Sequence, residues 1–144
     1  MEKEKILVSA CFIREGYKYS GGANINAEII KLQEKYEFIL ICPEVFGGLP
    51  TPRVPSEIVG EKVCNSIGED VTAEFFKGAY MALELAKKHN CKKAILKAKS
   101  PSCGKGRVYD GTFTHTTKDG NGIAAQLLID NGITVYTEEE LYNL

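Results

Sequence analysis

The chain has 144 residues, a formal net charge of −1 and a pI near 6.2. This length fits one compact domain over residues 1–144, and the balanced charge argues against general binding of nucleic acid or anionic membranes, which favours a basic face. No apolar run approaches the roughly 20 residues of a membrane helix. No signal peptide is visible either, so we expect a cytoplasmic protein, in which the five cysteines bind metal, react or pack without forming disulfides.

The first half of the chain is predicted to hold two strands and one helix. Apolar runs predict strands over residues 5–10 and 38–41, and apolar residues near helical spacing predict a helix over about 26–36. Four prolines between positions 43 and 55 exclude a helix or a central strand there. Within that irregular stretch, which runs to about residue 68, we expect a short hairpin of residues 57–59 against 62–64.

The second half is predicted to continue the alternation. Asp70 is expected to cap the clearest helix, and Asn90 suits its end. One apolar stripe marks this helix: Val71, Phe75, Ala79, Ala82, Leu83 and Ala86. Strands are expected at 93–97 and 133–136, with a helix over about 122–130 between them. Residues 137–140 read as a capping box that starts a short terminal helix.

This order predicts an α/β fold with a single doubly wound, Rossmann-like, mostly parallel sheet of about four strands flanked by helices. The strands are nearly continuous apolar runs, as expected when helices cover both faces of a sheet. In such a sheet the carboxyl ends of the strands lie side by side, and ligands bind in the crevice outside them.

Three cysteines stand at these carboxyl ends. Cys11, Cys42 and Cys103 follow the first, second and third predicted strands, so we expect their thiols to converge. Three thiolates without an obvious fourth ligand indicate a metal or iron–sulfur centre with one open position, as catalytic metal centres have. Cys64 and Cys91 lie away from this edge and are expected to be structural.

Two segments beside these cysteines carry further chemistry. The sequence SPSCGKG (residues 100–106) combines small residues and glycines, which let backbone N–H groups approach an anion or a sulfide. In this segment and just after it, Lys105 and Arg107 are expected to lower the pKa of Cys103 and so favour its thiolate. Glu44, two residues after Cys42, is a candidate general base, nucleophile or proton donor.

The segment YDGTF (residues 109–113) reads first as a turn, but it also offers substrate contacts. Tyr109 and Phe113 are candidates for stacking on a planar substrate, and Asp110 for binding its ring N–H groups. Arg53, between two prolines, is a candidate anion contact.

These motifs together resemble the family catalogued as domain of unknown function 523, which includes thiouracil desulfidase. The matching segments cover nearly the whole chain in order: residues 7–11, 42–53, 70–72, 100–104, 109–113 and 120–122. The most specific are CPEVFGGLPTPR and SPSCG. The chain departs from the family in having KYSG at residues 18–21, where relatives commonly have RYDG. Some relatives also carry a second domain, which we do not expect in this chain.

The resemblance implies an oxygen-sensitive [4Fe-4S] cluster held by Cys11, Cys42 and Cys103. It further implies that the substrate's sulfur binds the unique iron, and that water or a carboxylate then attacks the thiocarbonyl carbon without net redox change. Glu44 carries over as the catalytic carboxylate and Ser100 as an assisting polar group. Further expected substrate contacts are Ser102, Gly104, Tyr109, Asp110 and Arg53.

The expected function is therefore an iron–sulfur-dependent, non-redox desulfidase acting on thiouracil or a related small thiolated compound. No nucleic-acid or membrane partner is expected, and a homodimer would be one way to complete the ring-binding surface. Two alternatives stay open: a non-catalytic iron–sulfur module that carries sulfide, and a zinc hydrolase with three cysteine ligands. The cysteine spacing by itself does not choose between an iron–sulfur cluster and zinc.

Overall fold

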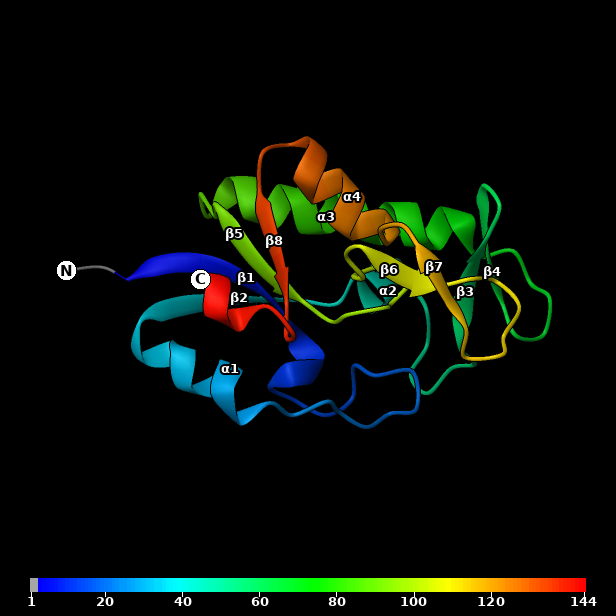
Figure 1. Cartoon of the computed structure of the whole chain (residues 1–144), viewed down its shortest axis with the longest axis horizontal. Helices are drawn as coiled ribbons and strands as arrows, with labels where there is room; N and C mark the ends of the chain where they lie inside the picture. Colours follow the sequence, from blue (N-terminus) through cyan, green and yellow to red (C-terminus); the bar gives the residue numbers. More distant parts are fainter. Residues whose placement is uncertain (1–2) are drawn as a thin grey trace.

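The computed structural model describes residues 3–144. Its centre is a parallel sheet of β1 (Glu4–Ser9), β2 (Tyr36–Ile41), β5 (Lys93–Leu96) and β8 (Thr134–Thr137), in the order β2-β1-β5-β8 (Figure 1). Successive strands are added outward from β1 on one side and from β5 on the other. The point where the direction reverses therefore lies between β1 and β5. This arrangement confirms the predicted doubly wound α/β fold.

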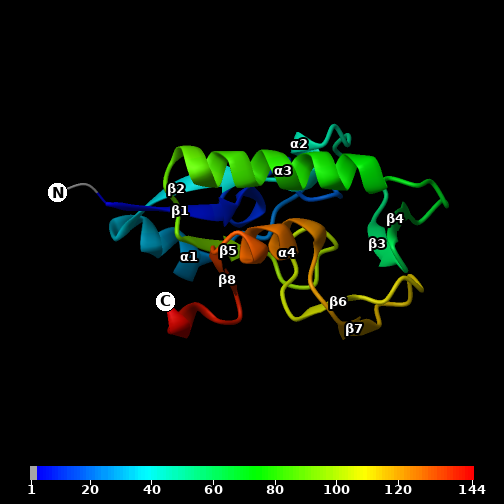
Figure 2. The ribbon, with the colours of Figure 1, turned by 90° about the horizontal axis from the view of Figure 1, so that it is seen from above.

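Helices cover both faces of the sheet. The long helix α3 (Thr72–Lys88) and α4 (Ile123–Asp130) lie on one face and α1 (Ala27–Lys31) on the other (Figures 1 and 2). Leu7 of β1 packs into the core under α3 and α4, whereas its neighbour Ile6 packs into the core beside α1. Alternate residues of a strand point to opposite faces of the sheet. Both residues are fully buried because helices cover both of these faces. No helix within residues 3–144 is long and apolar enough to span a membrane.

Two antiparallel hairpins extend beyond the carboxyl ends of the sheet (Figure 1). The predicted hairpin is present as β3 (Ser56–Val59) paired with β4 (Lys62–Asn65). A second hairpin, β6 (Arg107–Tyr109) paired with β7 (Thr117–Asp119), was not expected. Its strands have three residues each and largely polar sequences, so no apolar alternation marked them.

The first helix is shorter than predicted. Asn26 caps α1 by accepting the Ile29 N–H at 3.0 Å, but α1 ends at Lys31 and continues only as the 3-10 turn Leu32–Glu34. The predicted end at residue 36 is wrong because Tyr36 already pairs with Glu4 as the first residue of β2, with its side chain buried.

The proline-rich stretch does contain a helix, α2 (Pro43–Phe46), which contradicts the prediction. Proline is tolerated at the first helical position, where its missing N–H is not needed. Asp70 does not occupy the cap position of α3, which is Val71, although its carboxylate accepts the Thr72 N–H at 2.9 Å. At the C-terminus, Glu140 accepts the Thr137 N–H, yet only the 3-10 turn η3 (Leu141–Asn143) follows.

Candidate functional site

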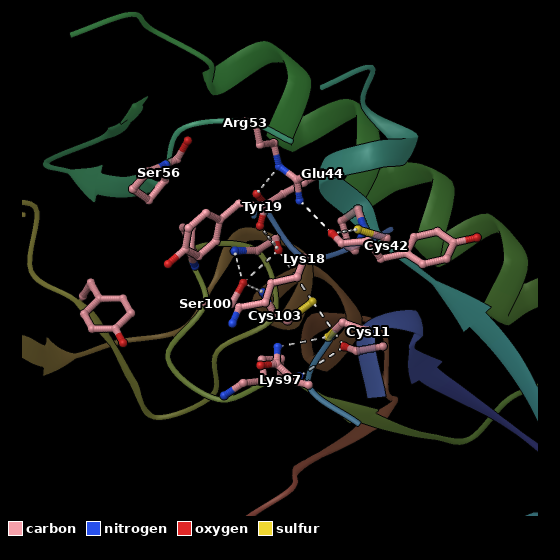
Figure 3. A pocket seen from close by; sticks show the side chains of 18 of the residues that line it. Cys11, Lys18, Tyr19, Cys42, Glu44, Arg53, Ser56, Lys97, Ser100 and Cys103 are labelled. Atoms are coloured by element: carbon pink, nitrogen blue, oxygen red, sulfur yellow. Dashed lines mark hydrogen bonds and ion pairs between the residues drawn. The ribbon is translucent and has the colours of Figure 1, made fainter. Parts of the chain in front are cut away.

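The three strand-end cysteines line one cavity of about 510 Å³ at the carboxyl edge of the sheet (Figure 3). Cys11 lies in a 3-10 turn (η1, Ala10–Phe12) directly after β1, and Cys42 separates β2 from α2. Cys103 lies in the loop that follows β5. The regular geometry of the parallel sheet thus brings together thiols that are far apart in sequence. The volume is within the roughly 300–1,000 Å³ range of small-molecule sites.

Burial dominates the electrostatics of these thiols. It raises the pKa of Cys11 and of Cys42, and it raises the pKa of Cys103 to about 12. The hydroxyls of Ser102 and Ser9 oppose the shift at Cys103, whereas the charges of Cys42 and Cys11 add to it.

The expectation that Lys105 and Arg107 lower the pKa of Cys103 is wrong. Lys105 pairs with Glu140 at 3.1 Å, and Arg107 pairs with Asp119 at 2.7 Å. Both cations are therefore directed to other carboxylates, and the thiol of Cys103 is left in a poorly solvated position. A thiol in such a place is deprotonated by a bound metal rather than by a neighbouring base.

The arrangement of these thiols fits a cluster better than a single ion. Within residues 3–144, no group of three or more His, Cys, Asp or Glu side chains is placed to hold one metal ion. In an iron–sulfur cluster each cysteine binds a different iron, so its ligands surround a volume and not a point. Three cysteines around a shared cavity would provide that arrangement.

Each thiol also has at least one polar neighbour, and Cys103 has a second one in Ser102 Oγ at 3.6 Å. Asn24 Nδ2 donates to Cys11 Sγ, Ser9 Oγ donates to Cys103 Sγ, and the Cys42 thiol donates to the Tyr17 carbonyl, each at 3.6 Å. Tyr17 and Asn24 belong to the long loop between β1 and α1, so these contacts fasten that loop over the cysteines. Hydrogen bonds of this kind orient metal ligands and tune their basicity.

Glu44 lies on the first turn of α2 and forms an ion pair with Arg53 at 3.1 Å (Figure 3). Only 16% of the Glu44 side chain and 7% of the Arg53 side chain are exposed. Arg53 also donates to the carbonyls of Tyr17 and Pro50. Because its guanidinium is directed to these protein groups, Arg53 is better described as the residue that fixes Glu44 than as the predicted anion contact for substrate.

Two serines link the cysteine loop to Glu44. Ser100 Oγ accepts the N–H groups of Ser102 and Cys103, each at 3.1 Å, which occupies both of its lone pairs. Its own proton therefore points to Ser102 Oγ at 3.0 Å. Ser102 has one hydroxyl proton, for which Glu44 Oε2 at 3.2 Å is the nearer acceptor and Cys103 Sγ at 3.6 Å the farther one. Ser102 is 2% exposed, so its hydroxyl is mainly an internal link, although the residue borders the cavity.

The position of α2 depends on direct backbone packing against α3. A Cβ atom added to Gly78 of α3 would lie 1.7 Å from the carbonyl oxygen of Pro43. A Cβ atom added to Gly47, just after α2, would lie 1.9 Å from the carbonyl oxygen of Glu74. The two glycines let α2 approach more closely than side chains would permit, and α2 carries Glu44.

The remaining predicted substrate contacts divide into two groups. Tyr109 and Phe113 line the cavity, whereas Gly104 and Asp110 do not. Gly104 is buried and donates its N–H to the Ser100 carbonyl, and Asp110 accepts the N–H of Thr112 in an exposed turn. The structure therefore does not support Gly104 or Asp110 as substrate contacts.

Several cavity residues carried no sequence signal. Lys97 follows β5 and pairs with Glu138 at 2.7 Å, and Glu57 lies on β3. Their placement depends on tertiary contacts, which no local pattern encodes. Cys64 and Cys91 do not line the cavity, and Cys91 belongs to the core under α3 and α4, in agreement with the expected structural role.

Known proteins match this chain in sequence and in structure. The family model described as 2-thiouracil desulfurase matches residues 6–140. A Bacillus subtilis (strain 168) relative, described as uncharacterized protein YbbK, is 38% identical over 96% of this chain and 99% of its own. The solved structure of the [4Fe-4S]-dependent thiouracil desulfidase TudS is 42% identical, covers 99% of this chain and 95% of its own, and superposes with a TM-score of 0.90.

These matches confirm the predicted family and enzyme class, and the solved relative depends on the cofactor that the resemblance implied. The chain belongs to the 2-thiouracil desulfurase family.

Proposed function

We propose that this protein is a [4Fe-4S]-dependent desulfidase that replaces the sulfur of thiouracil, or of a related small thiolated heterocycle, with oxygen. The single observation that carries the proposal is the meeting of Cys11, Cys42 and Cys103 with Glu44 in one cavity. Family membership and the TudS match support the same chemistry. The overall reaction converts a thiocarbonyl and water into a carbonyl and sulfide, and it changes no oxidation state.

Cys11, Cys42 and Cys103 would hold the cluster, which supplies a Lewis-acidic iron with an open position for the substrate's sulfur. Glu44 receives the proton of the attacking water in this scheme, or attacks the thiocarbonyl carbon itself. Arg53 holds one carboxylate oxygen of Glu44, and Ser102 contacts the other. Each oxygen retains a second lone pair for the reacting group.

Ser100 and Ser102 form a short chain of hydrogen bonds that ends on the Glu44 carboxylate. Ser100 donates to Ser102, which donates to Glu44, so the carboxylate is held in one orientation before substrate binds. A group fixed in this way does not have to reorganise during reaction. Ser100 also lines the cavity, and in this scheme it assists through Ser102, to which it donates.

The proposal is tested with protein purified and reconstituted without oxygen. Iron, sulfide and zinc are quantified, and 2-thiouracil is added while its thiocarbonyl absorbance is followed. We expect about four irons per chain and formation of uracil. Stoichiometric zinc without iron would favour the zinc hydrolase instead, and a four-iron cluster that transfers sulfide without desulfurising any thiolated base would favour the sulfide carrier.

The source of the new oxygen separates the two roles of Glu44. In a single turnover in ¹⁸O-water, direct attack by water puts the label into uracil. Attack by the carboxylate, followed by attack of labelled water on the Glu44 carboxyl carbon, breaks the bond between that carbon and the transferred oxygen. This route puts unlabelled oxygen into uracil and leaves the label in Glu44, which peptide mass spectrometry detects.

A further inference from the structure

Glu57 is a second carboxylate of the cavity, and it comes from the hairpin β3–β4 rather than from the sheet. The residue is only 7% exposed, yet it lines the same cavity as the cysteines. Its neighbour Ser56 lies at the opposite end of the pocket from Cys42 in Figure 3. Glutamate is rarely buried without partners, so the surroundings of Glu57 require an explanation.

One oxygen of Glu57 has a structural role. Oε1 accepts the N–H groups of Gly111 at 3.0 Å and of Phe113 at 3.2 Å. Both donors belong to the loop between β6 and β7. The carboxylate therefore joins the two hairpins, and its own position is fixed by two backbone donors.

The other oxygen is not used by the protein. Among residues 3–144, no hydrogen bond or ion pair engages Oε2 of Glu57. In the same part of the chain no fully buried side-chain oxygen lacks a partner, so Oε2 keeps access to open space. The side chain of Glu57 lines the cavity. Oε2 is thus an acceptor that the described residues leave free, on a carboxylate held in place through Oε1.

We infer that Glu57 Oε2 binds a ring N–H group of the substrate, so that the enzyme favours heterocyclic thiones that carry a ring N–H. This inference rests on the proposed function. A carboxylate can only accept hydrogen bonds, and N–H groups of a cyclic thioamide or thiourea are strong donors. Tyr109 and Phe113 line the same cavity and provide faces for a planar ring. The cysteine end and Glu57 then fix the ring at two points.

The test measures binding to the anaerobically purified, cluster-containing protein. Calorimetric titrations compare uracil with 1,3-dimethyluracil, which has no N–H, on the wild-type protein and on Glu57→Gln. The glutamine retains an amide oxygen for the Gly111 and Phe113 donors but removes the free carboxylate oxygen. Glu61→Gln, an exposed position in the turn of the same hairpin, is the control for the change in charge.

We expect the wild-type protein and Glu61→Gln to bind uracil at least about tenfold more tightly than 1,3-dimethyluracil, as a hydrogen bond to a charged group provides. In Glu57→Gln the ratio of the affinity for uracil to the affinity for 1,3-dimethyluracil falls towards one, and the iron content is unchanged. An unchanged ratio in a folded Glu57→Gln protein, or no binding of uracil to the wild type, would overturn the inference.

The wild-type protein provides an independent measurement if Glu57→Gln does not fold. The compounds 1-methyluracil and 3-methyluracil each retain one N–H, and the inference requires that at least one of them bind as weakly as the dimethyl compound. Equal binding of uracil and all three methylated forms would contradict it. If the protein binds uracil more tightly than 1,3-dimethyluracil but does not turn over 2-thiouracil, the proposed function is refuted and the inference about Glu57 is retained.

Discussion

The two ends of the cavity are built in different ways. At the sheet end, Cys11, Cys42 and Cys103 follow three adjacent parallel strands, whose spacing is set by the hydrogen-bonded ladder. At the hairpin end, Glu57 and Phe113 come from two short antiparallel hairpins joined by side-chain contacts. Under the proposed function, the regular sheet would present the cofactor ligands, whereas the hairpins would present the substrate contacts.

The largest effect is expected from removing a ligand at the sheet end. Cys103→Ala deletes one of three thiols around the cavity, so the iron content falls to near zero and turnover is lost. Cys64→Ala, on the hairpin strand β4 and outside the cavity, is the matched control and retains both iron and activity. Iron and sulfide analysis after anaerobic reconstitution checks this prediction, and full cluster retention in Cys103→Ala would contradict the ligand assignment.

Glu44→Gln separates turnover from cluster binding at the sheet end, because it removes a carboxylate and leaves all three thiols in place. We expect unchanged iron content and a drop in kcat of about 10²–10⁴, the usual contribution of a positioned acid–base group. The exposed Glu84→Gln on α3 serves as the control. Wild-type kcat in Glu44→Gln would remove this carboxylate from the mechanism.

A smaller effect is expected from Gly78→Ala, which acts on Glu44 through the backbone. The added methyl group collides with the Pro43 carbonyl and displaces α2. Overpacking of this kind typically costs about 1–3 kcal/mol of unfolding free energy. We expect a lower melting temperature and a reduced kcat. Lys77→Ala, the exposed neighbour on α3, changes neither. An unaltered kcat in Gly78→Ala would show that Glu44 tolerates movement of its helix.

The smallest effect is expected at the hairpin end. Phe113→Ala removes one ring face from the cavity and leaves every sheet-end residue in place. We expect KM for 2-thiouracil to rise several-fold, in line with about 0.5–1.5 kcal/mol for an aromatic pair, with kcat and iron content unchanged. Loss of the cluster in this variant would mean that the two ends are not separable.

Much of the fold and part of the site followed from sequence. The alternation of apolar runs and helical stripes predicted all four strands of the sheet, and the strand ends located the three cysteines. Predictions from local sequence patterns were wrong where contacts between distant parts of the chain determined the structure. Tyr36 joined β2 instead of the first helix, and Pro43 began a helix that the proline count had excluded.

The sequence by itself determined the α/β alternation and the positions of the cysteines, because hydrophobic period and parallel pairing are local and regular properties. Only the tertiary structure decided that Arg53 pairs with Glu44, that Gly78 supports α2, and that Glu57 joins the two hairpins through its Oε1. These contacts join elements distant in the chain whose docking is irregular. Their geometry follows from the packing of the hairpins and helices against the sheet, which no repeating sequence pattern records.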